Sequence, residues 1–387
     1  MPSKEKSMPS QYELITAKGL AVEWILKDQI TDPSNPDYGA YWGAYYPSQG
    51  KYQEPYMETA SFTLPTMVRC YLQTKDDRLL KSVNLCVNGW MKKALQYKDH
   101  GHPQLDKNAY GALKHNSYTP RFFTFDNGEA VRGVVFVYRL TKDWSQLQLA
   151  GEIAEWLIDV MQNPDGSFRT NYDLHPGKFD TYSDVKPVYH GRTAWSLLEL
   201  WRETGNRKYK DAAVKALTYV KSQQRDNGWF ETVGGLTEYM MYAAEGLYYS
   251  GKIMNNTSYV EAAMRTIRGF ARAPHKDRGD LYEFYDENWK PFKTEWAFNS
   301  EDGQQAVMCY NLYLDKEDKE FLDEGDACLL WLYQQQDRQS GNPGTYGGIP
   351  NSVGVTDWHT RYPIWSVKYF IDAIDLKLKI ISQEDEG

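Results

Sequence analysis

The chain repeats one landmark, an aromatic residue followed five or six positions later by glutamine. The first two steps between these aromatic residues are 66 residues long and the third is 63, and the next interval leaves room for one more unit at residues 259–273. Each landmark lies near the end of an amphipathic stretch, so the chain consists of six repeated helical hairpins. The five pairs are Trp24 with Gln29, Trp90 with Gln96, Trp156 with Gln162, Tyr219 with Gln224, and Trp331 with Gln336.

A second helix type lies between successive landmarks and is apolar almost all round. Its clearest example is residues 126–140, where Asp126 and Asn127 offer capping oxygens before an apolar run. A helix with this pattern is expected to be buried. We expect Thr59, Asp126 and Asp302 to cap helices of this type. The other five helices begin near Glu58, His190, Thr237, Glu301 and Tyr362.

The connections between helices alternate in length. Short polar turns such as Thr74-Lys75-Asp76-Asp77 and Ser250-Gly251-Lys252 join each buried helix to the next amphipathic one. Longer loops follow the amphipathic helices, which places the irregular connections on one face. The last buried helix is as apolar as the others, so a closed ring is favoured over an open solenoid with polar ends. The predicted fold is all-α, an (α/α)6 toroid spanning 12–380 as one domain, with flexible ends at 1–11 and 381–387.

Composition restricts the partners and the compartment. With 41% hydrophobic and 25% charged residues the chain is an ordinary globular protein, and its formal net charge of −8 disfavours nucleic acid and anionic membranes as partners. The polar amino terminus lacks the apolar core of a signal peptide and no run of 18 apolar residues exists, which predicts a cytoplasmic location. The four cysteines lack zinc spacing, so neither a metal nor a cofactor is predicted. A requirement for a divalent cation such as calcium and the oligomeric state stay open.

The segment that follows the amphipathic helices resembles a known repeat. Gln162-Asn163-Pro164-Asp165-Gly166-Ser167-Phe168 and Gln224-Arg225-Asp226-Asn227-Gly228-Trp229-Phe230 are similar to the repeat of the squalene-cyclase and prenyltransferase-like α/α-toroids. The acidic Asp-x-Asp-Asp motif of the protonating triterpene cyclases is absent. Asp126-Asn127-Gly128-Glu129-Ala130 resembles a short segment of the toroidal pectate lyases, which implies uronate chemistry. Fold alone does not imply function.

The starts of the six buried helices define the candidate site. If all six begin at the same end of the ring, their first residues converge on one cavity. The predicted catalytic residues are Asp126, Tyr189, His190, Arg192, Glu238 and Tyr239. The predicted substrate-binding residues are Trp42, Glu58, Asn127, Glu301, Asp302, His359, Arg361 and Tyr362.

Two arginines suggest the charge of the ligand. Arg192 and Arg361 stand at helix starts, where a cation opposes the helix dipole. Either they bind an anionic group such as the carboxylate of a uronic acid, or they pair with surrounding acids in a structural ion network. His190 is likewise either catalytic or a buried polar residue. Aromatic residues make up 15% of the chain and many lie in the long loops, so a carbohydrate is the predicted partner.

Two reaction classes fit these residues. A lyase or C5-epimerase acting on a uronic-acid sugar would use an arginine to neutralise the carboxylate and a tyrosine or histidine to move the C5 proton. A glycoside hydrolase would instead use two of the carboxyl groups. We favour the lyase or epimerase because of the arginines, with hydrolysis as the alternative. A glycan-binding protein without catalysis and an isoprenoid cyclase are further alternatives.

Overall fold

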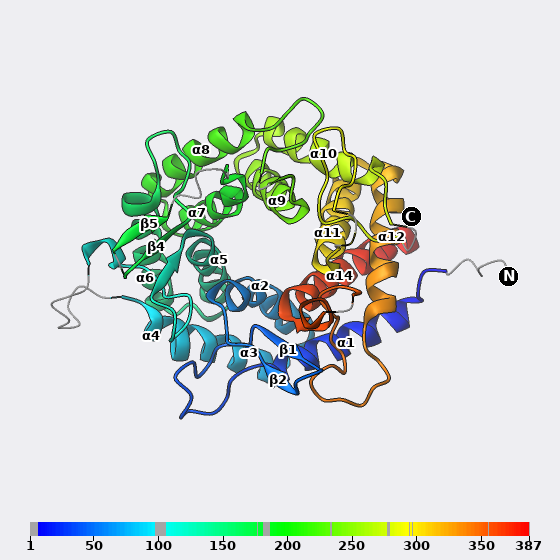
Figure 1. Ribbon diagram of the computed structural model, residues 1–387, viewed down its shortest axis with the longest axis horizontal. Helices are drawn as coiled ribbons and strands as arrows, with labels where there is room; N and C mark the ends of the chain where they lie inside the picture. Colours follow the sequence, from blue (N-terminus) through cyan, green and yellow to red (C-terminus); the bar gives the residue numbers. More distant parts are fainter. Residues whose placement is uncertain are drawn as a thin grey trace.

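The computed structural model shows a ring of two concentric layers of helices (Figure 1). It describes residues 7–96, 106–175, 177–180, 186–232, 234–276, 279–293, 295, 297–354 and 356–386. The predicted all-α (α/α)6 toroid is confirmed. The inner helices are α2 (Met57–Thr74), α5 (Thr124–Thr141), α7 (Gly191–Thr204), α9 (Thr237–Met254), α11 (Asn299–Lys316) and α14 (Ile364–Glu386). The outer layer contains α1 (Gln11–Lys27), α3 (Asp77–Asn84) with η1 (Leu85–Met91) and α4 (Lys92–Ala94), α6 (Trp144–Trp156) with η3 (Leu157–Met161), α8 (Arg207–Ser222), α10 (Thr257–Arg272) and α12 (Lys319–Gln335).

The short turns from inner to outer helices share one construction. Each of the first five inner helices ends at a residue in the left-handed region, such as Lys142 with φ 60°, and the next residue caps the outer helix. Asp143, for example, accepts a hydrogen bond from the Ser145 backbone N–H. Two residues therefore reverse the chain. The pairs are Lys75 and Asp76, Lys142 and Asp143, Gly205 and Asn206, Asn255 and Asn256, and Glu317 and Asp318.

One predicted turn was misplaced. The sequence suggested that α9 ends at Ser250-Gly251-Lys252, but the helix continues to Met254 and turns at Asn255. Gly251 lies inside the helix at a close approach to α10, where a Cβ atom would stand 2.8 Å from Val260 Cγ2. The glycine is therefore required for packing between helices rather than for ending one.

The repeated glutamines hold neighbouring hairpins together. The Gln29 amide donates to Gly39 O at 3.0 Å in its own loop and to Ser82 O at 2.9 Å in the next outer helix. Gln336 makes the same pair of bonds, to Gly347 O at 3.0 Å and to Ala17 O at 2.8 Å. Because Ala17 belongs to α1, the last outer helix is joined to the first one, and the ring is closed.

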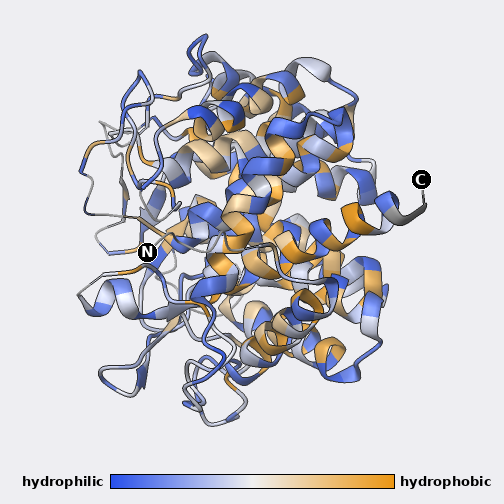
Figure 2. Cartoon of the chain, turned by 90° about the vertical axis from the view of Figure 1, so that its right-hand side faces the viewer, coloured by the Kyte–Doolittle hydropathy of each residue, from blue (hydrophilic) through white to orange (hydrophobic). Residues whose placement is uncertain are grey.

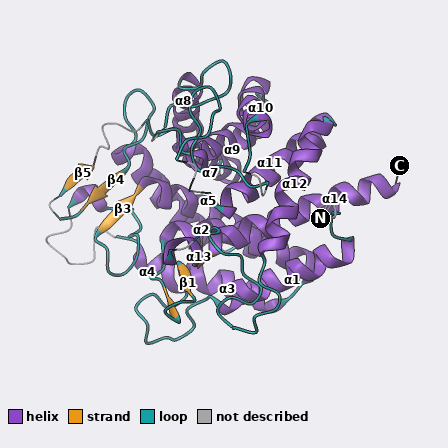
Figure 3. Ribbon diagram, turned by 45° about the vertical axis from the view of Figure 1, so that its right-hand side comes forward, coloured by secondary structure: helices purple, strands orange, loops and turns teal. Residues whose placement is uncertain are grey.

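The long connections gather at one end of the ring, on the left in Figure 2. They carry two three-stranded antiparallel sheets that the sequence did not predict (Figure 3). One sheet has the order β2-β1-β6 and the other β3-β4-β5. The short strands hold the loops over the amino ends of the inner helices. The strands are β1 (Ala44–Tyr46), β2 (Lys51–Tyr52), β3 (Arg121–Phe123), β4 (Asn171–Asp173), β5 (Lys178–Asp180) and β6 (Tyr362–Pro363).

The ends of the chain differ from the predicted boundaries. Helix α1 begins at Gln11, where Ser10 and Glu13 form a capping box. Helix α14 continues to Glu386, six residues beyond the predicted domain end at residue 380. Residues 1–6 and 387, which the sequence assigned to flexible ends, lie outside the described residues. No helix in the described part of the chain has the length and apolar character needed to cross a membrane.

Candidate active site

Five of the predicted site residues meet in one cavity of about 440 Å³ at the loop-bearing end of the ring. They come from three inner helices and the short segment before α7, which confirms that helix starts distant in sequence converge here. We call this space the loop-side cavity. Its lining residues are Glu58, His115, Phe123, Phe125, Asp126, Thr170, Tyr189, Glu238, Tyr239 and Tyr242.

The acids in this cavity do not cap their helices, contrary to the prediction for Asp126. Helix α5 begins at Thr124, two residues before Asp126, and its N-cap residue Phe123 makes no capping bond through its side chain. Thr59 and Asp302 are not caps either, because α2 and α11 also begin upstream of them. The Thr59 hydroxyl donates to the Tyr56 carbonyl, and the Asp302 carboxylate accepts from the Leu281 backbone N–H. The carboxyl group of Asp126 is therefore available to the cavity.

Asp126 is oriented by a histidine that the sequence analysis missed. The His115 Nδ1 atom lies 2.6 Å from Asp126 Oδ2. The imidazole is held between rings, stacked on Tyr56 with centroids 4.9 Å apart and edge-on to Phe123 at 5.0 Å. This pair fixes the direction of one carboxyl group and places a proton carrier beside it.

Glu58 and Glu238 are acids whose surroundings favour the protonated form. Burial raises the pKa of Glu58 well above its ordinary value, and the nearby charges of Asp126 and Glu238 raise it further. Burial also raises the pKa of Glu238, although the hydrogen bond from Tyr242 Oη at 2.6 Å acts in the opposite direction. The cavity thus contains carboxyl groups in different environments, an arrangement used for general acid and base catalysis.

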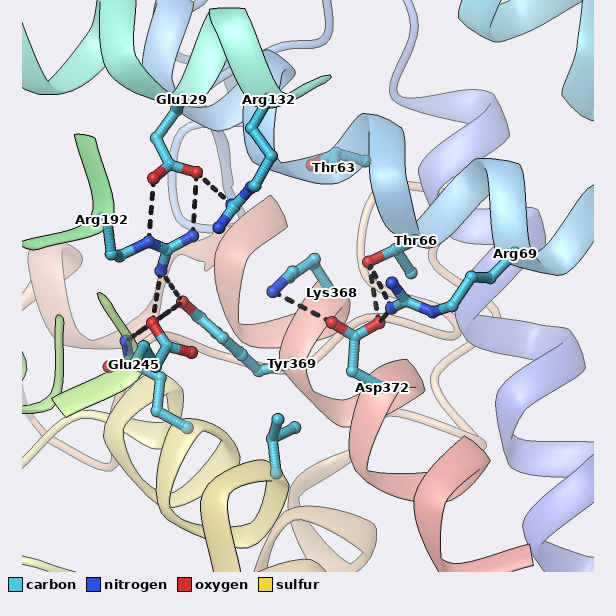
Figure 4. A network of polar contacts seen from close by, with 12 residues as sticks. Thr63, Thr66, Arg69, Glu129, Arg132, Arg192, Glu245, Lys368, Tyr369 and Asp372 are labelled. Carbon is cyan, nitrogen blue, oxygen red and sulfur yellow. Dashed lines mark hydrogen bonds and ion pairs between the residues drawn. The ribbon is translucent and has the colours of Figure 1, made fainter. Parts of the chain in front are cut away.

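Arg192 does not line the loop-side cavity. Its Nε and Nη2 atoms each bind a Glu129 carboxylate oxygen at 2.8 Å, and its Nη1 binds Glu245 at 2.7 Å. Only 1% of Arg192 is exposed. Of the two arrangements considered, Arg192 is found in the structural ion network (Figure 4). Its guanidinium lies 4.8 Å from the ring centre of Tyr242, which lines the loop-side cavity.

His190 is also buried behind the cavity. Its ring lies 4.3 Å from that of Tyr189 and 5.8 Å from that of Phe168, and its Nε2 atom has no hydrogen-bond partner among the described residues. Burial lowers the pKa of His190 to about 3, so the ring is neutral near pH 7. The geometry supports a positioning role for His190 through Tyr189, and its catalytic role stays a prediction.

Asn127 and Asp302 position the loops around the site. The Asn127 side chain accepts from the Leu113 backbone N–H at 2.7 Å and donates to the Leu113 carbonyl at 3.1 Å, so it binds the loop that carries His115. Asp302 accepts from the Leu281 backbone N–H at 3.0 Å in the loop before α11. Neither residue lines the loop-side cavity.

Glu301 adds to the acidic character of this end of the ring. Its carboxyl group is buried, which raises its pKa well above the ordinary value, and Glu283 and Glu238 raise it further. Glu283 belongs to the same group of acids: burial and the charge of Glu238 raise its pKa to about 7. Neither is among the lining residues of the cavity.

The other predicted binding residues lie around β1 and β6. Trp42 stacks on Tyr52 with centroids 5.6 Å apart, and Tyr362 pairs with Tyr45 between the strands. Arg361 is buried against the Trp358 ring at 3.3 Å and donates to Gln53 Oε1 at 2.7 Å. His359 lies close to Thr356. None of the four predicted residues lines the loop-side cavity, and their role in binding stays a prediction.

The lining residues with polar side chains that the sequence analysis missed fall into two groups. Tyr242 stands one helical turn after Glu238, so the spacing of four residues placed both side chains on one face and could have revealed it. His115 and Thr170 lie in long loops, which have no periodicity from which their direction could be predicted. Among the residues that the structure describes, no group of three or more histidine, cysteine, aspartate or glutamate side chains is arranged to hold a metal ion.

Comparison with known proteins identifies the fold. The sequence matches no protein-family model and no curated protein. The structure resembles a sugar epimerase from a ruminal bacterium, with a TM-score of 0.74 at 13% identity over 94% of this chain and 98% of that one. It also resembles an unsaturated glucuronyl hydrolase specific for heparin, with a TM-score of 0.73 at 15% identity over 96% of this chain and 99% of that one. A D-mannose isomerase has a TM-score of 0.74 at 12% identity over 97% of this chain and 100% of that one. At these identities the similarity establishes that the chain shares the α/α-toroid fold of these proteins.

Proposed function

We propose that this protein is a carbohydrate-processing enzyme that hydrolyses a glycosidic bond in the loop-side cavity. The observation that carries the proposal is the meeting of three carboxyl groups, from Glu58, Asp126 and Glu238, in one aromatic-lined cavity. Hydrolysis requires one protonated and one ionised carboxyl group beside the bond that breaks. Tyrosine and phenylalanine rings offer faces for a sugar ring. The fold shared with a glucuronyl hydrolase and with sugar epimerases agrees with this class of substrate.

In the proposed reaction Glu58 is the general acid and Asp126 the base or nucleophile. Burial and the nearby charges of Asp126 and Glu238 raise the pKa of Glu58, which favours the protonated form that a general acid needs. Asp126 is oriented by His115, whose Nδ1 atom lies 2.6 Å from Asp126 Oδ2. Glu58 would protonate the leaving oxygen while Asp126 activates water or attacks the anomeric carbon. Tyr242, bound to Glu238, would keep this third carboxyl group in place.

The charge of the lining favours a neutral sugar at the reacting position. Three acids line the loop-side cavity, and no arginine or lysine does so among the described residues. Asp126 is the acid that the proposed reaction keeps ionised, and a uronate carboxylate placed beside it would face its negative charge with no lining cation to offset it. Of the two arginines expected to neutralise it, Arg192 is already bound to Glu129 and Glu245, and Arg361 does not line the cavity. Elimination from a uronate is therefore less well supported than the sequence suggested.

Epimerisation is the second candidate, because proton carriers other than carboxyl groups line the same cavity. His115, Tyr189 and Tyr239 could remove a proton from one face of a sugar and return it to the other. Three of the solved structures with this fold are described as a sugar epimerase, a cellobiose 2-epimerase and a D-mannose isomerase.

One experiment separates these reactions. The protein is incubated with neutral and uronate oligosaccharides in D2O, and reducing ends, ultraviolet absorbance and deuterium incorporation are followed together. Hydrolysis produces reducing ends alone, elimination adds an absorbing unsaturated product, and epimerisation incorporates deuterium without cleavage. We expect the first result; deuterium exchange without new reducing ends would contradict hydrolysis.

Isosteric variants test the assigned residues. Asp126→Asn and Glu58→Gln should each lower kcat by roughly 10²–10⁴-fold, because each removes one proton-transfer group while keeping its shape. Asp226→Asn, at an exposed acid on the outer loop, is the matched control and should keep full activity. Unchanged kcat in both site variants would overturn the assignment. Melting temperatures measured in parallel show whether a loss of activity reflects unfolding.

A further inference from the structure

A second cavity, of about 460 Å³, opens at the opposite end of the ring, where the short turns lie. We call it the turn-side cavity. Its walls come from all six inner helices. They include Arg69, Arg132, Trp195, Tyr249, Lys368 and Asp372. The layer of Arg192 and Tyr242 separates this cavity from the loop-side cavity, so neither serves as an extension of the other.

The two cavities differ in charge. The loop-side cavity is lined by acids, whereas five arginine and lysine side chains and four acids line the turn-side cavity. Most of these acids already form ion pairs with arginine or lysine side chains. Asp372 binds Arg69 and Lys368, and Glu245 binds Arg192 (Figure 4). These ion pairs contain one more cation than anion. Three carboxylates, those of Glu129, Glu245 and Asp372, pair with four cations, Arg69, Arg132, Arg192 and Lys368.

Arg132 shows where an anion is needed. Only 2% of this side chain is exposed, and one of its terminal nitrogens binds Glu129. Its Nε and Nη1 atoms are buried and have no hydrogen-bond acceptor among the described residues. A buried donor without an acceptor costs about 1–3 kcal/mol, and more when it carries charge. Burial, together with the nearby charge of Arg192, lowers the pKa of Arg132, although Glu129 acts against this.

The surroundings of Arg132 match an organic ligand. The guanidinium stacks on Trp195 at 4.0 Å, and the Trp195 ring in turn stacks on Tyr249 with centroids 4.2 Å apart. These rings form an apolar wall beside the cationic group. Lys368 faces the same space and is held by Asp372 at 3.0 Å. A ligand with one anionic group and a neutral body would satisfy both parts of the cavity.

We propose that the turn-side cavity binds a small organic molecule that carries an oxyanion, either a carboxylate or a phosphate. Oxygens of this group accept from the free N–H groups of Arg132 and are attracted by Lys368 and Arg69. The body of the molecule packs on Trp195 and Tyr249. This site is independent of the proposed hydrolysis, because it uses a different cavity and no catalytic carboxyl group.

Binding is tested by calorimetry on the full chain at constant ionic strength, with inorganic phosphate, glucose 6-phosphate and glucuronate as probes. At least one probe should bind saturably and raise the melting temperature. Phosphate binding identifies a phosphate site, and glucuronate binding alone identifies a carboxylate site. If none of the three binds, the proposal is wrong.

Variants then locate the site. Arg132→Lys keeps the charge and the pairing with Glu129 but loses the two free donors, so the Kd should rise roughly tenfold or more. Asp126→Asn, in the other cavity, should bind like the wild type. Equal affinity in Arg132→Lys would overturn the assignment.

A second pair of variants covers the case in which Arg132→Lys does not fold. Lys379 lines the mouth of the turn-side cavity and is exposed, so Lys379→Glu should not disturb packing. It should raise the Kd about threefold or more at low salt. Lys51→Glu changes the net charge equally at the loop-bearing end and is the control. Equal affinities in the two variants would place the anion elsewhere.

Discussion

At the scale of single residues, charge and burial decide which of the predicted site residues face the cavity. Glu58, Asp126 and Glu238 reach the loop-side cavity because each inner helix begins one or more residues before them, which turns the side chains inward from the first helical turn. Arg192 lies near a helix start as well, but Glu129 and Glu245 bind it below the cavity. Residue type alone did not show which side chains face the cavity and which are held in ion pairs, because the ion-pair partners of Arg192 come from other helices.

His190 gives a prediction about stability at acid pH. Burial lowers its pKa to about 3, below the ordinary value of 6.5. The neutral form therefore stabilises the fold fully above pH 6.5, and this contribution is lost as pH falls toward 3, by at most about 1.4 kcal/mol per pH unit. In His190→Asn no proton is taken up, so the free energy of unfolding should fall less steeply with pH over this interval than in the wild type.

Urea denaturation between pH 6.5 and 4 measures this difference. His175→Asn is the control, because His175 is exposed, whereas His190 is buried against the rings of Tyr189 and Phe168. The control should follow the wild-type curve. If His190→Asn has the same pH dependence as the wild type, His190 is accessible to protons in the folded state and the buried position is wrong.

At the scale of helices and turns, the sequence predicted the elements better than their ends. The buried helices and the short turns followed from apolar runs bounded by Asp and Asn, since these residues supply the caps of the outer helices. The turn after α9 was misplaced because Gly251 has two possible uses, to end a helix or to let two helices approach closely. Local sequence does not distinguish them. The contact that decides is made with Val260, on the next helix.

Gly251→Ala tests the packing explanation. Alanine favours a helix by about 1 kcal/mol over glycine, so a glycine with open space around it should be improved by this change. At Gly251 the new Cβ would stand 2.8 Å from Val260 Cγ2 and 2.9 Å from Asn256 O, so the free energy of unfolding should fall by roughly 1–3 kcal/mol. Gly19→Ala in α1 is the matched control, because within the described residues no side chain or neighbouring segment comes within 4 Å of its Cβ position. The control should gain stability in the same denaturation experiment; a gain at both glycines would contradict the packing.

At the scale of the whole molecule, ring closure was predictable and the shape of the cavities was not. Closure followed from the apolar last helix, which a linear stack would expose. The cavity walls depend on long loops such as the one carrying His115, whose direction is set by Asn127 through contacts with Leu113. Such contacts join segments with no common period. The repeat therefore predicts where the functional end lies, but not which loop residues complete it.

The closed ring gives the last prediction, at the seam between α12 and α1. Gln336 crosses this seam to Ala17 as Gln29 crosses an interior interface to Ser82, and both glutamines are at most 7% exposed. In a closed ring the two interfaces are equivalent, so Gln336→Ala and Gln29→Ala should each lower the free energy of unfolding by about 1–3 kcal/mol, since each removes two buried hydrogen bonds, one within its own loop and one across the interface. In an open solenoid the first and last helices would be frayed in solution, and the Gln336→Ala change would cost almost nothing. Guanidinium denaturation of the two variants distinguishes these cases: equal losses support closure, and a loss confined to Gln29→Ala would show that the ring is open at α1.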